Sequence, residues 1–475
     1  MARKQHMHEV CAIILAAGEG TRMRSRLTKV LHPLLGRPMI SYPVELCLGL
    51  GVKRILVVVG PQANAVKDVL AGRSVEFVHQ AGPRGTAHAV LQTETALAGF
   101  GGTVLVLAGD TPLLQAETVG GLLEAHHAAR AVATILTARV DNPTGYGRIL
   151  RDRRGRLMRI VEEVEATAKE RAVSEINAGC YCFAGPALFP ALKQVKASRV
   201  KGEFFLPKVV ETLLRRRRVQ TFRATDPVEV LGINARAELA AASGVLRQRV
   251  TQRLMNAGVT LLDPAATYID GTVEVGPDTI IYPGVILQGA TTIGKGCVIY
   301  GHCRIQDARL ADNVTILDGS VIRESEVAEG CVVGPYAHLR PQSRLRPKAK
   351  VGNFCEVKKA VIGAGSKVPH LAYIGDATLG ERVNIGAGTI TCNYDGFAKH
   401  ETIIEDEVFV GSNTNLVAPV TVGRGAIVAA GSTITEAVPP DAVAFGRASQ
   451  VNKEGRAGAT RKKRQAMAPP ESDED

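Results

Sequence analysis

The sequence predicts an α/β domain followed by a parallel β-helix. Up to about Asn234, short apolar runs alternate with stretches of helical character. From Val275 onward an aliphatic residue recurs in steps of six, with one-residue slips before Leu310 and Val327 and a restart at Ile404. An alanine- and leucine-rich segment separates the two patterns. At 475 residues, 45% of them hydrophobic, the chain is long enough for at least two packed domains.

The first pattern indicates buried strands joined by helices, which is the arrangement of an α/β sheet. We expect this domain to span residues 1–234. The expected strands are the runs "CAIIL" at 11–15, "RILVVV" at 54–59, "VEFV" at 75–78, "TVLVLA" at 103–108 and "ATILTA" at 133–138.

The segment between the two patterns predicts one long helix from about Ala235 to Ala257, because its apolar residues fall at helical spacing and alanine and leucine favour helices. We assign residues 235–262 to a connecting element.

The second pattern predicts a β-helix over residues 263–450, each six-residue step giving one short strand with one inward aliphatic side chain. The alternative fold, a β-sandwich, would need longer segments in which apolar and polar residues alternate. Glycine often follows the aliphatic position, where a tight corner is easiest without a Cβ. The repeating positions are Val275, Ile281, Leu287, Ile293, Ile299, Ile305, Leu310, Ile316, Ile322, Val327, Val333, Leu339, Leu345, Val351, Val357, Ile404, Val410, Leu416, Val422, Val428 and Ile434.

The formal charge of +12 and the arginine-rich runs at 151–156, 215–218 and 461–464 raise the question of a nucleic-acid partner. Aromatic residues make up only 4% of the chain, so the platforms for base stacking are missing. We expect most of these arginine-rich runs to form solvated surfaces and some of the positive charge to bind small anionic substrates. Residues 451–475 join a basic block to an acidic one and predict a disordered tail.

Cysteine usage and hydropathy predict a cytoplasmic protein with no membrane contact. The nine cysteines lack paired metal-ligand spacing, and the "CYC" motif places Cys180 and Cys182 on one strand face. We therefore expect the cysteines to remain reduced thiols, as is typical of cytoplasmic proteins. No apolar run reaches the ~20 residues that a membrane-spanning helix needs.

The loop "LAAGEGTRM" at 15–23 directly follows the first expected strand. A dinucleotide-binding fingerprint needs a third glycine where Met23 stands, and a P-loop needs Gly-Lys-Ser/Thr, so both are disfavoured. Two interpretations stay open: a plain Gly-x-Gly turn, or a loop whose backbone N–H groups approach a nucleotide while Arg22 and Lys29 meet its phosphates.

Two single residues also have alternative interpretations. Asp110 follows a buried strand at the edge where open α/β sheets bind ligands, so it is placed for Mg²⁺, or it caps a helix that begins at Thr111-Pro112. His370 interrupts a β-helix rung, and it is either a solvated turn residue or a general base, since histidine ordinarily titrates near ~6.5.

A resemblance covers nearly all of the chain from Val10 to Val451. The motifs "LAAGEGTRM…KVLHPLLGRPMI", "HQAGPRGTAHAV", "LAGDTPLL", "NPTGYGRI", "IVEE", "EINAGCYCF" and "GINAR" occur in the order of the sugar-nucleotide pyrophosphorylases. With "HLAYIGD" and "NIGAGTITCNYDG" in the repeat half, the sequence resembles the bifunctional bacterial family that combines glucosamine-1-phosphate N-acetyltransferase and N-acetylglucosamine-1-phosphate uridyltransferase. It departs from that pattern at Thr28, where the family usually has proline.

For the first half the resemblance implies a Rossmann-like nucleotidyltransferase that uses UTP and Mg²⁺. Arg22 and Lys29 would be catalytic, and Asp110 and Asn234 would hold the metal. The implied nucleotide- and sugar-binding residues are Leu15, Ala16, Ala17, Gly18, Lys29, Gln80, Gly85, Thr86, Gly147, Glu162, Asn177 and Asn234.

For the second half it implies a left-handed β-helix, a homotrimer, and transfer of acetyl from acetyl-CoA to glucosamine 1-phosphate with His370 as base. Glu356 is a weaker candidate to orient His370. The implied residues are Arg340, Lys358, Tyr373 and Asn384 for the acceptor, and Ala387, Asn393, Tyr394, Ser412, Ala430 and Arg447 for acetyl-CoA. Two rival hypotheses are a nucleotidyltransferase whose β-helix serves only assembly or allosteric binding, and an RNA-binding or structural scaffold.

Overall fold

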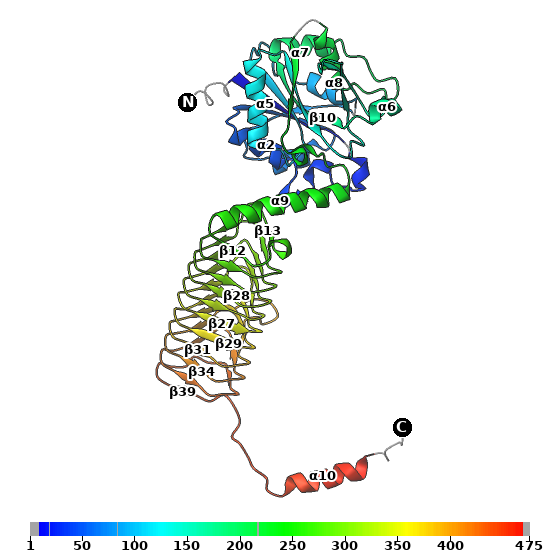
Figure 1. Ribbon diagram of the computed structural model, residues 1–475. Helices are drawn as coiled ribbons and strands as arrows, with labels where there is room; N and C mark the ends of the chain where they lie inside the picture. The colour runs from blue at the N-terminus through cyan, green and yellow to red at the C-terminus, as the bar shows by residue number, and fades with distance from the viewer. Residues whose placement is uncertain (1–8, 19, 83, 216–217, 469–475) are drawn as a thin grey trace. The chain divides into compact units, whose positions relative to one another are not determined.

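The computed structural model describes residues 9–18, 20–82, 84–215 and 218–468 (Figure 1). The chain divides into two compact units, residues 1–254 with 268–272, and residues 255–267 with 273–475. The long helix α9 (Arg236–Asn256) ends earlier than the predicted connecting segment, because strand β12 (Thr260–Leu261) already belongs to the second unit. Through Leu254 the helix is part of the first unit, where Ala242 and Leu246 pack into an apolar cluster with Leu34 and Met39.

The first unit contains a nine-stranded sheet in which seven strands follow the order β11-β7-β10-β6-β1-β4-β5, and β8 and β9 extend it from β10. The pairs β11-β7, β6-β1, β1-β4 and β4-β5 are parallel, but β10 runs antiparallel to both β6 and β7. The strands are β1 (Val10–Ala16), β4 (Arg54–Val59), β5 (Glu76–His79), β6 (Thr103–Ala108), β7 (Ala133–Arg139), β8 (Arg148–Arg151), β9 (Leu157–Val161), β10 (Glu175–Ala184) and β11 (Val219–Arg223).

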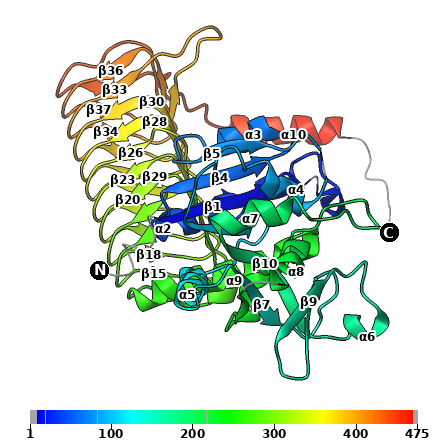
Figure 2. The same ribbon diagram turned by 90° about the horizontal axis from the view of Figure 1, so that it is seen from above.

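Apolar clusters cover both faces of this sheet. Alternate residues of β1 enter opposite clusters, with Ala12 and Ile14 on one face and Cys11 and Ile13 on the other. Cys180 and Cys182 share one face, as predicted. Figure 2 shows β5, β4 and β1 side by side. The helices are α2 (Ser41–Gly49), α3 (Ala63–Val69), α4 (Thr86–Leu91), α5 (Ala116–Ala128), α6 (Ala168–Arg171), α7 (Gly185–Leu192), α8 (Pro207–Leu214) and α9.

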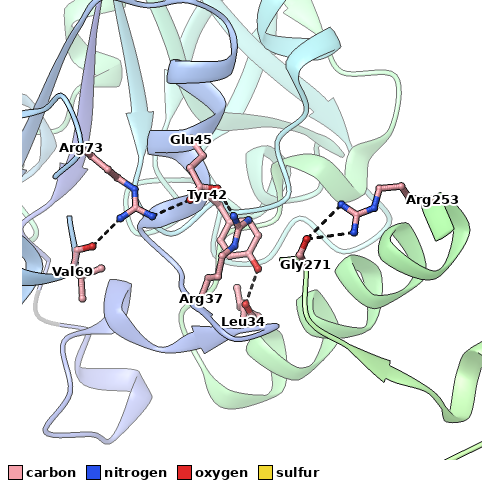
Figure 3. Close-up of polar contacts among 8 residues, drawn as sticks. All are labelled: Leu34, Arg37, Tyr42, Glu45, Val69, Arg73, Arg253 and Gly271. Atoms are coloured by element: carbon pink, nitrogen blue, oxygen red, sulfur yellow. Dashed lines mark hydrogen bonds and ion pairs between the residues drawn. The ribbon is translucent and has the colours of Figure 1, made fainter. Parts of the chain in front are cut away.

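A small hairpin of β2 (Pro33–Leu34) and β3 (Arg37–Pro38) follows the turn that carries Lys29 and is fixed by side chains of α2 (Figure 3). The Tyr42 hydroxyl donates to the Leu34 carbonyl at 2.6 Å. Glu45 accepts from Arg37 and, at 3.0 Å, from Arg73. Figure 3 also shows Arg253 of α9 directed at the Gly271 carbonyl, 3.4 Å away.

The second unit is the left-handed parallel β-helix of six-residue repeats, and Figure 1 shows its short strands stacked coil upon coil. Strands of successive coils pair in parallel with a step of 17 or 18 residues in the regular part, as Ile281 with Ile299 and Ile293 with Leu310 illustrate. An 11-stranded sheet has the order β12-β15-β18-β21-β24-β27-β29-β31-β34-β37-β39, and the other faces form a 17-stranded sheet.

The strands of the 11-stranded sheet are β12, β15 (Ile280–Ile281), β18 (Val298–Ile299), β21 (Thr315–Ile316), β24 (Val332–Val333), β27 (Lys350–Asn353), β29 (Lys367–His370), β31 (Asn384–Ile385), β34 (Phe409–Val410), β37 (Ile427–Val428) and β39 (Val443–Ala444).

The strands of the 17-stranded sheet are β13 (Tyr268–Ile269), β14 (Glu274–Val275), β16 (Ile286–Gln288), β17 (Thr292–Ile293), β19 (Arg304–Gln306), β20 (Arg309–Leu310), β22 (Val321–Arg323), β23 (Glu326–Val327), β25 (His338–Leu339), β26 (Arg344–Leu345), β28 (Glu356–Ile362), β30 (Tyr373–Leu379), β32 (Ile390–Cys392), β33 (Thr402–Ile404), β35 (Asn415–Val417), β36 (Val420–Val422) and β38 (Thr433–Ile434).

The predicted six-residue register is confirmed, because every repeating position is buried apart from Val275, which is half-buried. Glycine at the corners permits close stacking of the coils. A Cβ on Gly363 would lie 1.8 Å from the carbonyl oxygen of Gly380. A side chain at that position would therefore force the two coils apart.

The C-terminal segment differs from its prediction. Residues 456–467, expected to be disordered, form helix α10 (Arg456–Met467), none of whose side chains is buried. Its alanine, arginine and lysine residues favour helix without needing a packed face. Residues 469–475 of that tail, and 216–217 of one arginine run, lie outside the described residues.

All nine cysteines are free thiols, as predicted. Among the described residues, no helix combines the length and the apolar character needed to cross a membrane.

Candidate functional site

The predicted nucleotide-binding residues gather at the carboxyl edge of the first sheet. Ala16, Val59 and His79 are partners in register across β1, β4 and β5, and Leu15 pairs with Ala108 of β6. Because these strands are parallel, the residues that follow them emerge at the same edge. That edge carries Ala17 and Gly18, Gln80, and Asp110.

Lys29 connects three distant segments at this edge. Its Nζ donates to Asp110 Oδ2 and, at 3.1 Å, to Asn234 Oδ1. The two predicted metal ligands therefore direct oxygen atoms at one point. The alternative role of Asp110 as a helix cap is wrong, because the next helix, α5, begins at Ala116 with Gln115 as its N-cap.

Gly20 of the glycine loop packs against the side chain of Lys29. Gly20 has φ of +65°, and a Cβ there would lie 2.4 Å from Lys29 Cβ. A larger residue would therefore displace the lysine as well as strain the backbone. Arg22 lies in the short 3₁₀ helix η2 (Thr21–Met23) and is exposed, whereas Lys29 begins η3 (Lys29–Leu31). The two predicted cations thus lie on consecutive short helices, and Lys29 faces the Asp110 carboxylate.

Gln80, Gly85 and Thr86 form a second group at the same edge. Gln80 is buried, and its Nε2 lies 3.3 Å from the Gly85 carbonyl and 2.9 Å from His88 Nδ1. Gly85 approaches the backbone so closely that a Cβ would lie 2.5 Å from the Phe204 carbonyl oxygen. Thr86 Oγ1 accepts from the Leu206 N–H at 3.0 Å. These contacts fix the start of α4.

Of the predicted sugar-binding residues, Gly147 lies close to both Glu162 and Asn177. A Cβ on Gly147 would lie 3.5 Å from both Asn177 Cβ and Glu162 Oε1. Asn177 Nδ2 donates to the Tyr181 hydroxyl at 2.6 Å. Burial, and then the nearby Glu165 carboxylate, raise the pKa of Glu162. This group of residues therefore offers a carboxyl group with a raised proton affinity near a fixed amide.

In the β-helix, His370 lies at the end of β29, and its Nδ1 is 2.7 Å from Asn353 Oδ1 on the preceding coil. An amide oxygen can only accept, so Nδ1 carries a proton in this contact, and in the neutral imidazole the lone pair is then on Nε2. Glu356, the weaker candidate to orient His370, instead pairs with Arg340 at 2.7 Å. Asn353 is therefore the residue that orients the imidazole.

Among the predicted acceptor residues, the two cations Arg340 and Lys358 and the phenol of Tyr373 lie on or directly after strands of the 17-stranded sheet. Lys399 and, less strongly, Arg340 lower the pKa of Lys358, because the ammonium group lies among like charges. The Tyr373 hydroxyl lies close to Gly375. Asn393 Nδ2 lies 3.4 Å from the same hydroxyl oxygen. Asn384 lies on β31 in the other sheet, paired with the β29 strand that carries His370.

The predicted acetyl-CoA residues follow successive coils toward the C-terminal end. A Cβ on Gly386 would meet Ser412 N at 2.4 Å, and one on Gly411 would meet Ala430 N at 2.4 Å. Ala387, Ser412 and Ala430 therefore stack at one corner. Arg447 Cδ lies 3.8 Å from the Cβ position of Gly431. Tyr394 is exposed on the excursion between β32 and β33, whereas Asn393 donates to the buried Asp376 at 2.6 Å.

Sequence reasoning missed Asn353 and Lys399. Asn353 lies in "VGNF", which carries no predicted site residue, and Lys399 lies five residues after Tyr394, beyond the end of the "NYDG" motif. The coil length was the available signal for Asn353, since it precedes His370 by 17 residues. Lys399 meets Lys358 only because residues 393–401 leave the regular coil, which no periodicity predicts.

These features define a class of protein: a nucleotide-binding α/β transferase unit joined to a hexapeptide-repeat β-helix. The nucleotidyl transferase family model matches residues 11–226, and the bacterial transferase hexapeptide model, of six repeats, matches residues 401–436. Three similar curated proteins, each named bifunctional protein GlmU, come from Halalkalibacterium halodurans (48% identity over 93% of this chain and 97% of the relative), Trichlorobacter lovleyi (50%, 94% and 97%) and Listeria monocytogenes serotype 4a (49%, 94% and 97%). The chain belongs to the bifunctional GlmU family.

Proposed function

We propose that the chain carries out two consecutive reactions. The β-helix transfers acetyl from acetyl-CoA to glucosamine 1-phosphate, and the α/β unit then joins UMP from UTP to the product, giving UDP-N-acetylglucosamine and pyrophosphate. The convergence of Lys29, Asp110 and Asn234 at the edge that the glycine loop borders is the single observation that carries the nucleotidyl step. The product is a precursor for the bacterial cell wall.

In the α/β unit the nucleophile is a phosphate oxygen of the sugar phosphate, which attacks the α-phosphorus of UTP while pyrophosphate leaves. The nucleophile is already an anion, so no general base is needed. Two polyanions must nevertheless meet, and Arg22 and Lys29 stabilise the charge on the α-phosphoryl group and on the leaving pyrophosphate. Leu15, Ala16, Ala17, Gly18, Gln80, Gly85 and Thr86 bind the nucleotide, and Gly147, Glu162 and Asn177 bind the sugar.

Asp110 and Asn234 would hold Mg²⁺. Their two oxygen atoms meet at the Lys29 ammonium group, and hard oxygen donors of this kind suit Mg²⁺, which completes its shell with water and phosphate oxygens. When bound, the ion would add positive charge beside the triphosphate. Lys29 would then be released from the carboxylate to contact a phosphate.

In the β-helix, His370 Nε2 removes a proton from the glucosamine amine as the amine attacks the thioester carbonyl, and coenzyme A leaves as its thiol. The Asn353 contact holds the imidazole in the tautomer that this step needs. Arg340, Lys358, Tyr373 and Asn384 bind the phosphate-bearing acceptor, and Lys399 adds a third cation. Ala387, Asn393, Tyr394, Ser412, Ala430 and Arg447 bind acetyl-CoA.

We also propose a cytoplasmic homotrimer assembled through the β-helix. Paired neighbours on the 11-stranded sheet expose an apolar row, Phe409, Ile427 and Val443, with 49%, 45% and 53% of each residue accessible in the single chain. A second copy could cover this row. Sedimentation of the purified protein tests the assembly, and a monomer would contradict it.

One experiment tests the whole proposal. The protein is incubated with glucosamine 1-phosphate, acetyl-CoA, UTP and Mg²⁺, and the product mass is measured together with released coenzyme A thiol and pyrophosphate. We expect UDP-N-acetylglucosamine and both by-products. Release of pyrophosphate alone, with N-acetylglucosamine 1-phosphate supplied, would leave the β-helix an assembly element, and release of neither would favour a scaffold.

A further inference from the structure

The segment between η2 and η3 is tied to the start of helix α3 by one side-chain hydrogen bond. Thr28 Oγ1 donates to Gln62 Oε1, joining residues separated by 34 positions in the sequence. Thr28 is the N-cap residue of η3, where a threonine hydroxyl would ordinarily accept from a backbone N–H of the helix. Here it makes no cap hydrogen bond. Its hydroxyl therefore serves the link to Gln62 rather than the local turn.

Thr28 and Gln62 both line a pocket of about 310 Å³ beside the glycine loop. Ala17 and Gly18 of the loop line it on one side, and Gly60 and Val66 line it on another. Gly60 approaches so closely that a Cβ would lie 2.8 Å from the Ala17 carbonyl oxygen. The turn before α3 thus rests directly on the loop that follows β1, so it is a fixed point to which Thr28 can be attached.

Lys29, the residue next to Thr28, depends on the backbone that this link holds. The lysine stem passes Gly20, and its Nζ reaches Asp110 and Asn234. On its N-terminal side, residues 24–28 form no helix or strand, and Arg24 adopts a left-handed backbone with φ of +46°. Without the link, this irregular segment would be free to carry the start of η3 away from the loop.

We infer that Thr28 and Gln62 form a latch that positions Lys29 for the nucleotide phosphates. The inference rests on the proposed function of the α/β unit, and both residues are positioning residues that act through Lys29. The latch orders the segment before UTP arrives. Loss of the latch lowers the fraction of binding-competent enzyme, so it raises KM for UTP and leaves kcat unchanged.

The test compares steady-state kinetics of uridylyl transfer in the full chain. Thr28→Val keeps the shape and removes the hydroxyl, and Gln62→Met keeps the length and removes the acceptor. We expect each to reduce kcat/KM for UTP by about 3- to 10-fold, the range for one neutral hydrogen bond, through KM alone. The double variant should lose no more than either single variant, because both remove the same bond. Thr28→Ser should retain the parent values.

Thr28→Pro should order the same backbone segment without the hydrogen bond to Gln62. Thr28 has φ of −54°, close to the value that a proline ring imposes, and its N–H makes no hydrogen bond within the described residues. We expect this variant to keep the parent KM for UTP and to become insensitive to Gln62→Met. A 3- to 10-fold effect of Gln62→Met in the proline background would overturn the latch.

The outcomes separate this inference from the proposed function. A parent protein that releases no pyrophosphate from UTP and N-acetylglucosamine 1-phosphate would refute the nucleotidyl function itself. A parent that is active, with Thr28→Val and Gln62→Met both at parental KM, would refute only the latch. Additive losses in the double variant would refute it as well. Acetyl transfer, measured in the same samples, should stay constant because it belongs to the β-helix.

Discussion

In the β-helix the side chains that meet are one coil apart, since Asn353 and His370 are separated by 17 residues and Arg340 and Glu356 by 16. In the α/β unit Lys29 meets Asp110 across 81 residues and Asn234 across 205. The first site is therefore built by local stacking, and the second requires the whole sheet and the turn before α9. Substitutions should accordingly affect one reaction at a time.

The largest expected effect is in the β-helix. His370→Ala should reduce acetyl transfer by about 10²- to 10⁴-fold, the range for loss of a general base, and leave uridylyl transfer unchanged. His370 is exposed at the end of β29, outside the buried column, so the coils should stay in register. The two reactions are assayed separately on the same sample, and raising the pH should restore part of the acetyl transfer by deprotonating the substrate amine.

His302→Asn is the matched control for this variant. His302 is another exposed histidine of the β-helix, at a corner with φ of +58°, a conformation that asparagine tolerates. It should acetylate at the parent rate. A parental rate for His370→Ala with saturating acetyl-CoA would identify His370 as a turn residue, and loss of both reactions would indicate a folding defect that crosses the two units.

The next effect is in the α/β unit. Asp110→Asn keeps the shape of the side chain and removes the charge that faces Lys29, so uridylyl transfer should fall by about 10²- to 10³-fold, the range for removing one electrostatic contributor to the transition state. Acetyl transfer should remain at the parent rate. Pyrophosphate release and coenzyme A release measure the two reactions.

The control is Asp141→Asn, which removes an exposed carboxylate of the same unit. It should leave both reactions unchanged. If Asp110→Asn matched this control, the convergence of Asp110, Asn234 and Lys29 would have no part in catalysis.

The same contrast explains what the sequence could predict. The six-residue register needs only neighbouring coils, so a count along the chain found the buried positions from Ile281 to Ile434. The site edge of the α/β sheet was predictable because each segment follows a strand. The antiparallel direction of β10 was not, since an apolar run has no direction. The partner of Glu356 was also missed, because residue type alone does not tell which of Arg340 or His370 lies nearer.

The last expected effect concerns stability and is confined to the α/β unit. His126 of α5 is 3% exposed, and its Nδ1 lies 3.0 Å from Thr134 Oγ1 on β7. Burial, and then the neighbouring His127, lower the pKa of His126 from 6.5 to about 4. Between these two values the unfolded chain binds a proton that the folded chain does not. The free energy of unfolding should therefore decrease as the pH falls through this window, by about 3 kcal/mol at most.

His126→Asn removes the titrating group and keeps a polar atom for Thr134, so the pH dependence that His126 contributes should disappear. Protection factors from amide hydrogen exchange, corrected for intrinsic rates, measure this in α5 and β7 between pH 7 and 4.5. His79→Asn, at the exposed end of β5, is the control and should keep the parental slope. Peptides of the β-helix should not respond to His126→Asn, because its stacking is local. An unchanged slope in α5 for His126→Asn, or an equal change in the β-helix, would break the distinction between the two units.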